Sequence, residues 1–158
     1  MYVSTRGRRH LTGGETGTPM FYTIPLMVIP LVIFNIVGFI WGHDVWSGEL
    51  LGLTMVSGQR WVFSLSDLMV LVGIVCLFFE ILKSTGSTTR IITNHILSTI
   101  IFIIFLIEFI VVGFAANSVF FILMILALFD VVAGFTITIK TASRDITYSR
   151  GEGTPPAI

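Results

Sequence analysis

Long apolar runs, separated by short polar segments, dominate this sequence. Four of the runs come close to the roughly 20 apolar residues that a helix needs to cross a bilayer. They lie at residues 20–41, 65–82, 91–114 and 119–139. Lipid accepts apolar side chains on every face of a helix, whereas the backbone polar groups must be satisfied within the helix itself. The pattern therefore predicts an all-α membrane protein, a bundle of four transmembrane helices.

Local signals mark where these helices begin, bend and turn. Ser64 and Asp67 have the S-x-x-D spacing of a capping box at the start of the second helix. Pro25 and Pro30 predict a bend in the first helix, because each removes a backbone donor and crowds the preceding turn. Only residues 115–118 separate the third helix from the fourth, so we expect these two helices to be antiparallel neighbours.

The two ends of the chain differ from the apolar runs. Residues 1–19 are polar, glycine-rich and basic, a composition typical of a flexible tail. Residues 140–158 are polar and rich in turn-forming residues, which predicts a short frayed extension of the last helix followed by coil. Residues 20–139 are therefore expected to form a single transmembrane domain.

The segment at residues 42–64 is the longest one between the helices. Its stretches 51–56 and 60–65 are apolar or β-prone, and they flank the turn residues 57–59. This arrangement favours a β-hairpin lying on the membrane surface. An interfacial helix is the alternative, because the pattern is too short to separate the two by periodicity. In either form this loop is amphipathic, and we expect it to cap the bundle.

Composition and charge agree with a membrane protein and add an orientation. The chain is 54% hydrophobic and 11% charged, whereas about 25% of the residues in an ordinary soluble domain are charged. Its formal net charge is zero, which gives no basis for a nucleic-acid partner. Eight of the nine Lys and Arg residues fall on one side of the predicted bundle: Arg6, Arg8, Arg9, Lys83, Arg90, Lys140, Arg144 and Arg150. Because basic loops stay on the cytoplasmic side, both termini are predicted to be cytoplasmic.

The tryptophans indicate the same orientation. Trp41, Trp46 and Trp61 all lie in or beside the loop at residues 42–64. An indole ring is suited to the boundary between lipid and water, so we expect these residues to anchor the outer interface. The expected location is a bacterial inner (cytoplasmic) membrane, with the chain as a multi-pass protein of the bilayer.

Asp130 is the ionisable residue placed deepest in the predicted membrane. It lies eleven residues, or about 16 Å, from the outer end of the fourth helix, so its carboxyl cannot easily reach the headgroups. Ala127 and Gly134 share its side of the helix, which predicts tight packing against another helix. Two interpretations follow: a proton or cation relay, or a neutral carboxylic acid that is hydrogen-bonded to a neighbouring helix.

Glu108 and Asn35 lie at a similar depth near the outer ends of their helices. We expect a hydrogen bond between them, and the alternative role is a binding site or an ion path that includes Asp130. Gly38 and Gly42 follow Asn35 with GxxxG spacing, which permits close approach of two helices.

A second polar group is predicted at the cytoplasmic mouth of the bundle. Glu80 precedes Lys83 by three residues, so both lie on one helix face. His95 and Thr99 stand at a similar depth on the next helix. The four residues form either a functional cluster or a set of interfacial groups satisfied by water and by one another.

Other kinds of chemistry find no support in the sequence. The single cysteine, Cys76, excludes an intramolecular disulfide and a multi-cysteine zinc site. One histidine within the spans excludes the paired axial ligands of a transmembrane haem. His43, Asp44 and Glu49 lack the spacing of a metal site, and no catalytic triad, phosphate loop or HExxH motif is present. We therefore expect no enzyme activity, cofactor or metal.

Two functions remain. The first is a non-catalytic accessory or assembly subunit, or a homo-oligomerising bundle, that contacts the lipid bilayer and a membrane-protein partner or a second copy. The second is a small proton- or cation-coupled transporter or channel that uses Asp130 and Glu108. The chain is similar in size to four-helix transporters of the small multidrug type, but their essential glutamate lies in the first helix, where this chain has only Asn35.

Overall fold

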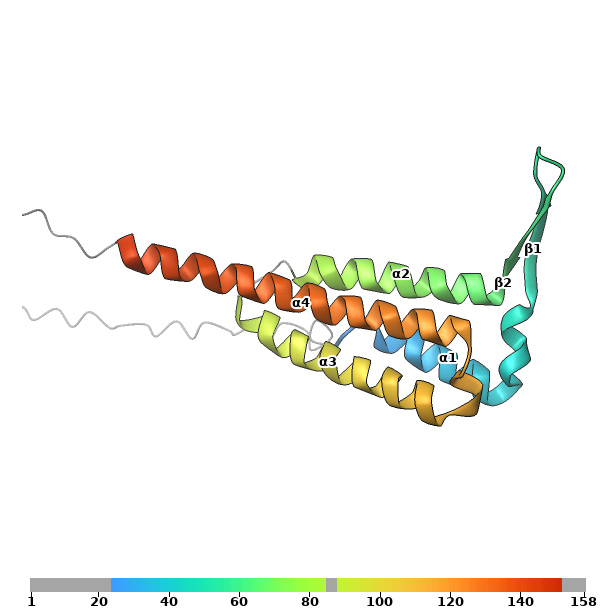
Figure 1. Ribbon diagram of the computed structural model, residues 1–158, viewed down its shortest axis with the longest axis horizontal. Coiled ribbons are helices and arrows are strands. Elements are labelled where there is room, and N and C mark those ends of the chain that lie inside the picture. Colours follow the sequence, from blue (N-terminus) through green and yellow to red (C-terminus); the bar gives the residue numbers. More distant parts are fainter. Residues whose placement is uncertain (1–23, 85–87, 152–158) are drawn as a thin grey trace, which may run out of the picture.

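The computed structural model describes residues 24–84 and 88–151, and within them the side chains of residues 24–83 and 95–140. This part of the chain is mostly helical (Figure 1). Its long helices are α1 (Val28–Trp41), α2 (Leu65–Ser84), α3 (Thr88–Val111) and α4 (Ser118–Gly151). The predicted N-terminal tail and the first four residues of the predicted first helix lie outside the described residues.

The long helices run side by side in alternating directions (Figure 1). α4 lies against both α2 and α3, and α1 packs on α2 and on the start of α4. The predicted antiparallel pairing of α3 with α4 is therefore confirmed. The start of α1 and the C-terminal end of α4 lie toward the same end of the bundle. We call this the inner end, and the end where α2 begins the outer end.

The predicted capping box at the start of α2 is confirmed. The Ser64 backbone N–H donates to the Asp67 carboxylate over 2.8 Å, and the Asp67 N–H donates to the Ser64 hydroxyl over 3.4 Å. This reciprocal pair satisfies two backbone donors that the first turn of a helix leaves without a partner. The start of α2 is thus determined by its own sequence.

The prediction that the first helix begins at residue 20 is wrong over residues 24–27, which form a turn. The Pro25 carbonyl accepts a hydrogen bond from the Val28 N–H over 3.2 Å, and α1 begins at Val28. Pro30 lies in the first turn of α1, where a missing N–H costs no helical hydrogen bond. The predicted bend is thus a helix start, and the 14 residues of α1 span only about 21 Å.

α4 is longer than predicted. It continues beyond the expected end at residue 139 as far as Gly151, for 34 residues in all. The sequence has no Gly or Pro between Gly134 and Gly151 to stop it. The polar residues after Lys140 therefore extend the helix instead of forming coil.

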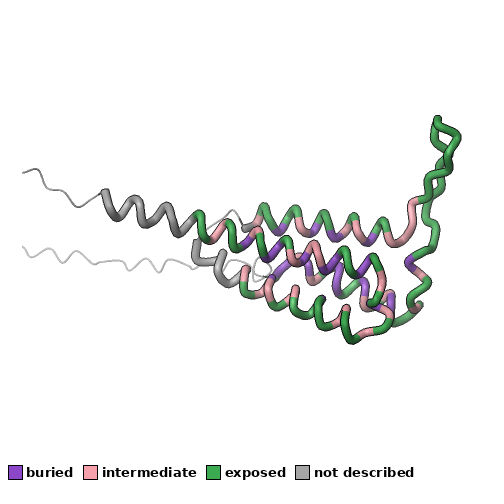
Figure 2. The backbone as a smooth tube through the Cα atoms, viewed as in Figure 1, coloured by how far each residue is buried: buried purple, intermediate pink, exposed green. Residues whose placement is uncertain are grey.

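Of the two forms that the sequence left open for the segment between α1 and α2, the structure has the β-hairpin. A short 3₁₀ helix, η2 (His43–Ser47), precedes an antiparallel hairpin of β1 (Glu49–Thr54) and β2 (Arg60–Ser64). η2 covers the outer end of the core through the buried Trp46. The hairpin instead projects crosswise to the helices and is exposed along almost its whole length (Figures 1 and 2). The expectation that this loop caps the bundle is met by η2 and not by the hairpin.

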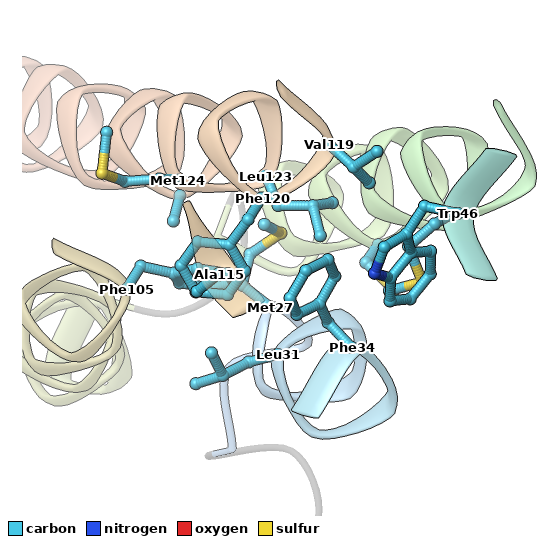
Figure 3. Close-up of a cluster of buried hydrophobic side chains, with 13 residues drawn as sticks. Met27, Leu31, Phe34, Trp46, Phe105, Ala115, Val119, Phe120, Leu123 and Met124 are labelled. Carbon is cyan, nitrogen blue, oxygen red and sulfur yellow. The ribbon is translucent and has the colours of Figure 1, made fainter. Parts of the chain in front are cut away.

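The hydrophobic core is densest toward the outer end. Phe34 of α1 stacks on Trp46 with ring centroids 4.4 Å apart, and it packs against Phe120 of α4 at 4.7 Å (Figure 3). Phe105 of α3 contacts the other side of Phe120 at 5.3 Å. Aromatic rings from α1, α3, α4 and η2 therefore interlock at one level of the bundle.

The outer surface of the bundle is apolar. Within the described residues, two helical segments are long and apolar enough to cross a membrane, Leu65–Lys83 and Ser118–Lys140, with mean hydropathies of 2.4 and 2.5. Only 22% and 39% of their residues are buried within the protein. A core helix of a soluble protein would hide most of its apolar side chains, whereas these remain exposed. Length, composition and exposure together indicate association with a membrane.

Candidate functional site

Three polar side chains are buried in the described core: Glu80 of α2, Ser98 of α3 and Asp130 of α4. Counted along their helices, they lie about 22, 20 and 18 Å from the outer helix ends. They therefore share one level in the inner half of the bundle. From the sequence, Glu80 and Asp130 were expected in separate groups, and the structure brings them together.

These residues form one connected cluster with Lys83. A hydrogen bond links the Ser98 hydroxyl to the Asp130 carboxyl, and Glu80 and Lys83 both interact electrostatically with Asp130. The Lys83 ammonium forms an ion pair with Glu80 over 3.0 Å. We call Glu80, Lys83, Ser98 and Asp130 the inner polar cluster. Of its oxygens, Asp130 Oδ2 is buried and has no hydrogen-bond partner among the described residues.

The inner polar cluster also bonds to the backbone of the turn at residues 24–27, in front of α1. The Leu26 N–H donates to the Glu80 carboxylate over 2.8 Å, and the Lys83 ammonium donates to the Ile24 carbonyl over 2.9 Å. The length of α1, about 21 Å, puts its start at the depth of Glu80. A backbone group left without a partner in an apolar medium costs several kcal/mol. Glu80 and Lys83 thus satisfy backbone groups that the proline-induced turn releases.

His95 and Thr99, which the sequence grouped with Glu80 and Lys83, bond elsewhere. The His95 ring lies edge-on to Phe135 at a centroid distance of 3.8 Å, and neither ring nitrogen has a hydrogen-bond partner among the described residues. The Thr99 hydroxyl donates to the His95 carbonyl of its own helix over 2.9 Å. Neither residue extends the inner polar cluster.

The predicted pair of Glu108 and Asn35 lies toward the outer end, on the wall of a groove. Their side chains are hydrogen-bonded to each other, and the Asn35 amide also donates to the Leu31 carbonyl over 3.1 Å. The groove has a volume of about 490 Å³ and runs between α1 and α3. Its other lining residues are all apolar: Leu31, Val32, Ile36, Ile104, Ile107, Val111 and Val112. We call it the α1/α3 groove.

Asp130 and Glu108 do not share a site. Glu108 is only about 5 Å from the outer end of α3, whereas Asp130 is about 18 Å from the outer end of α4. Asp130 is enclosed and 4% exposed, and it does not line the α1/α3 groove. The described residues therefore contain two separate polar centres at different depths.

The small residues proposed for helix packing have different surroundings. Ala127 is buried in the core. A Cβ at Gly38 would come within 2.7 Å of the Phe114 ring, and a Cβ at Gly134 would come within 2.6 Å of His95 Nδ1. Gly42 instead ends α1: its φ is 78°, and its N–H donates to the Gly38 carbonyl over 2.9 Å. A positive φ favours glycine, so the backbone conformation accounts for Gly42. A Cβ at this position would meet no atom within 4 Å, so Gly42 is not a close helix contact.

The three tryptophans also differ in their surroundings. Trp46 is buried, and its indole N–H has no hydrogen-bond partner among the described residues. Trp41 at the end of α1 is 64% exposed, and Trp61 in the hairpin is 44% exposed. Two of the three expected interface anchors thus have surface available to lipid headgroups, and the third packs inside the bundle.

The buried and groove-lining polar side chains mainly link one helix to another. Among the described side chains, no three His, Cys, Asp or Glu residues gather as the ligands of a metal ion would. The inner polar cluster joins α2, α3 and α4 to the turn in front of α1, and Asn35 and Glu108 join α1 to α3. Compared with known proteins, the chain matches no protein-family model, no curated sequence and no solved structure.

Proposed function

We propose that this chain is a non-catalytic, multi-pass membrane protein that acts through helix packing as an accessory or assembly subunit. α2 and α4 provide two crossings by length and composition. Exposed apolar side chains on α1 and α3, including Phe39 and Ile110, support two more, because in water they would form a large hydrophobic surface.

The distribution of basic residues supports a cytoplasmic inner end. In a four-crossing bundle both tails then lie in the cytoplasm, since the start of α1 and the end of α4 lie toward the same end (Figure 1). We propose the cytoplasmic membrane of a bacterium as the location, with the hairpin and η2 on its outer side.

The main support for a role in helix packing is the α1/α3 groove. It runs along about 10 Å of α3, and its apolar rims include Ile36 and Ile107, both more than half exposed. Asn35 and Glu108 place one carboxamide and one carboxyl on its wall. Polar groups at membrane depth are costly unless another helix or water satisfies them. We propose that a transmembrane helix carrying a hydrogen-bond donor packs into this groove.

Site-specific photo-crosslinking tests this proposal. Benzoylphenylalanine replaces Ile107 at the groove or, as a matched control, Phe129 on α4; both native side chains are 56% exposed. In membranes, position 107 should give a protein adduct of defined mass, and position 129 should give none. The adduct mass distinguishes a second copy from a different subunit. If the two positions give the same products, or lipid adducts only, the packing proposal is wrong.

One observation favours the alternative function, proton-coupled transport. The inner polar cluster holds two carboxyls but one ammonium, and Asp130 Oδ2 lacks a hydrogen-bond partner among the described residues. The cluster therefore has room for one additional proton. Proton flux into liposomes separates the two functions: a transporter should lose flux with Asp130→Asn, whereas a packing subunit should show the same background flux with and without the substitution.

A further inference from the structure

The β-hairpin has one face made entirely of apolar side chains. Its cross-strand pairs include Leu51 with Phe63 and Leu53 with Trp61, and residues that alternate along each strand point to the same side. Trp61 and Phe63 also contact each other, with ring centroids 5.8 Å apart. We call Leu51, Leu53, Trp61 and Phe63 the apolar face of the hairpin.

The charged groups of the hairpin lie on the opposite face. Arg60 pairs with Thr54 across the strands and forms an ion pair with Glu49. A Cβ added at Gly52 would collide with both the Glu49 carboxylate and the Arg60 guanidinium. The ion pair therefore covers Gly52, and the register shift between Glu49 and Leu51 lets Glu49 reach this side. The hairpin is thus amphipathic across its thickness.

The base of the hairpin is attached to the outer end of α2. Ser64, the last residue of β2, caps α2, and the Leu65 N–H donates to the Gly48 carbonyl over 2.9 Å. From there the hairpin runs crosswise to the helices and continues past α2, away from the bundle (Figure 1). Leu51, Leu53 and Trp61 remain close to half exposed, so the bundle does not cover them (Figure 2).

We propose that the apolar face lies on the lipid bilayer, at the boundary between headgroups and acyl chains of the outer leaflet beside α2. This inference rests on the proposed membrane crossing, because the outer end of α2 sets the level of the hairpin. A ribbon crosswise to a membrane-spanning helix lies parallel to the membrane plane. An isolated two-stranded hairpin is marginally stable in water, so it gains from a second surface.

Three features favour lipid as the partner that covers the apolar face of the hairpin. The apolar face carries no charge, and its Trp61 is of the residue type enriched at membrane boundaries. The first turns of α2, which follow directly on the hairpin, also carry exposed apolar residues, Leu68 and Leu71, which would meet the acyl chains of the same leaflet. The binding is therefore expected to be independent of lipid headgroup charge.

Spin labels at two adjacent positions test the orientation of the hairpin. The full chain carries Cys76→Ser and either Leu53→Cys on the apolar face or Thr54→Cys on the charged face, in bilayers of zwitterionic lipid. The label at 53 should collide more with oxygen, which concentrates in lipid, and the label at 54 more with a water-soluble nickel chelate. Anionic lipid should leave both results unchanged.

A third label at Phe129, an exposed residue of α4, separates failure of this inference from failure of the membrane crossing. If Phe129→Cys favours oxygen while positions 53 and 54 both favour the nickel chelate, the hairpin stands in water and the inference is wrong. If position 53 is shielded from both reagents, a protein covers the apolar face, and lipid is excluded as its occupant. If position 129 itself favours the nickel chelate, the membrane crossing is wrong.

Discussion

The inner and outer halves of the bundle are held together by different chemistry. In the inner half, Glu80 forms an ion pair with Lys83 of its own helix and accepts from the Leu26 N–H. A hydrogen bond between Asp130 and Ser98 joins α4 to α3. In the outer half, Phe34 is packed between Trp46 and Phe120 by contacts that depend on shape (Figure 3). The two halves therefore respond differently to substitution.

The difference follows from the state of the backbone at each level. At the outer end, backbone groups are satisfied locally: the Gly42 N–H bonds to the Gly38 carbonyl, and the Asn117 side chain accepts from the Phe120 N–H over 2.9 Å. At the inner end, the turn at Pro25 releases backbone groups that only side chains of another helix satisfy. Buried charge in this protein thus satisfies backbone groups at an interrupted helix start.

The largest expected effect is that of Glu80→Ala. It leaves the Leu26 N–H without its acceptor and the Lys83 ammonium without its carboxylate partner, and breaking a buried pair costs about 3–5 kcal/mol. The free energy of unfolding, measured by denaturation with SDS in bicelles, should fall by this amount. Glu49→Ala is the control, since it removes an exposed ion pair that contributes less than about 1 kcal/mol. Equal losses for both variants would show that the buried polar contacts of Glu80 do not hold the inner half together.

Gly73→Val tests the close contact of α2 with α4 between the two ends. A Cβ at Gly73 would come within 2.6 Å of a Leu123 methyl carbon and 3.0 Å of a Leu126 methyl carbon. Overpacking of this kind should cost about 1–3 kcal/mol in the same assay. Gly113→Ala is the matched control, because a Cβ there meets no atom within 4 Å. A neutral result for Gly73→Val would show that α2 and α4 separate easily at this level.

The smallest expected effect is that of Trp46→Phe in the outer half. The substitution keeps an aromatic ring stacked on Phe34 and removes an indole N–H that has no hydrogen-bond partner among the described residues. It should therefore cost less than about 1.5 kcal/mol. Trp46→Ala, which removes the ring, should cost about 3–5 kcal/mol. Equal costs for the two variants would mean that the N–H has a partner and that the outer half also depends on directional bonds.

Elements with local signals could be predicted from the sequence. The capping box of Ser64 and Asp67 acts within one helical turn, so its spacing alone placed the start of α2. The hairpin was one of two forms expected for its segment, from two β-prone stretches around a short turn, and the structure selects it over an interfacial helix. The start of α1 was missed because hydropathy does not register a hydrogen bond between Leu26 and Glu80, which are 54 residues apart in the chain.

The sequence identified most residues of the candidate site, but it did not predict which of them lie together. Asp130 and Glu80 were both identified by their charge within apolar runs, yet they were assigned to different centres. Comparing their distances from the outer helix ends would have placed them at one level and would have drawn attention to Ser98. Ser98 itself carries no distinctive signal, because a serine within an apolar helix usually satisfies its hydroxyl on its own backbone.

The sequence by itself determined the apolar helices, the capping signal of α2, the β-prone stretches around a turn and the asymmetric distribution of basic residues, because each depends on composition or on residues close in the chain. Only the tertiary structure decided which polar groups meet, that the turn before α1 is completed by Glu80 and Lys83, and that the hairpin turns away from the bundle. These features depend on contacts between segments far apart in the chain, whose relative depth and rotation no local pattern specifies.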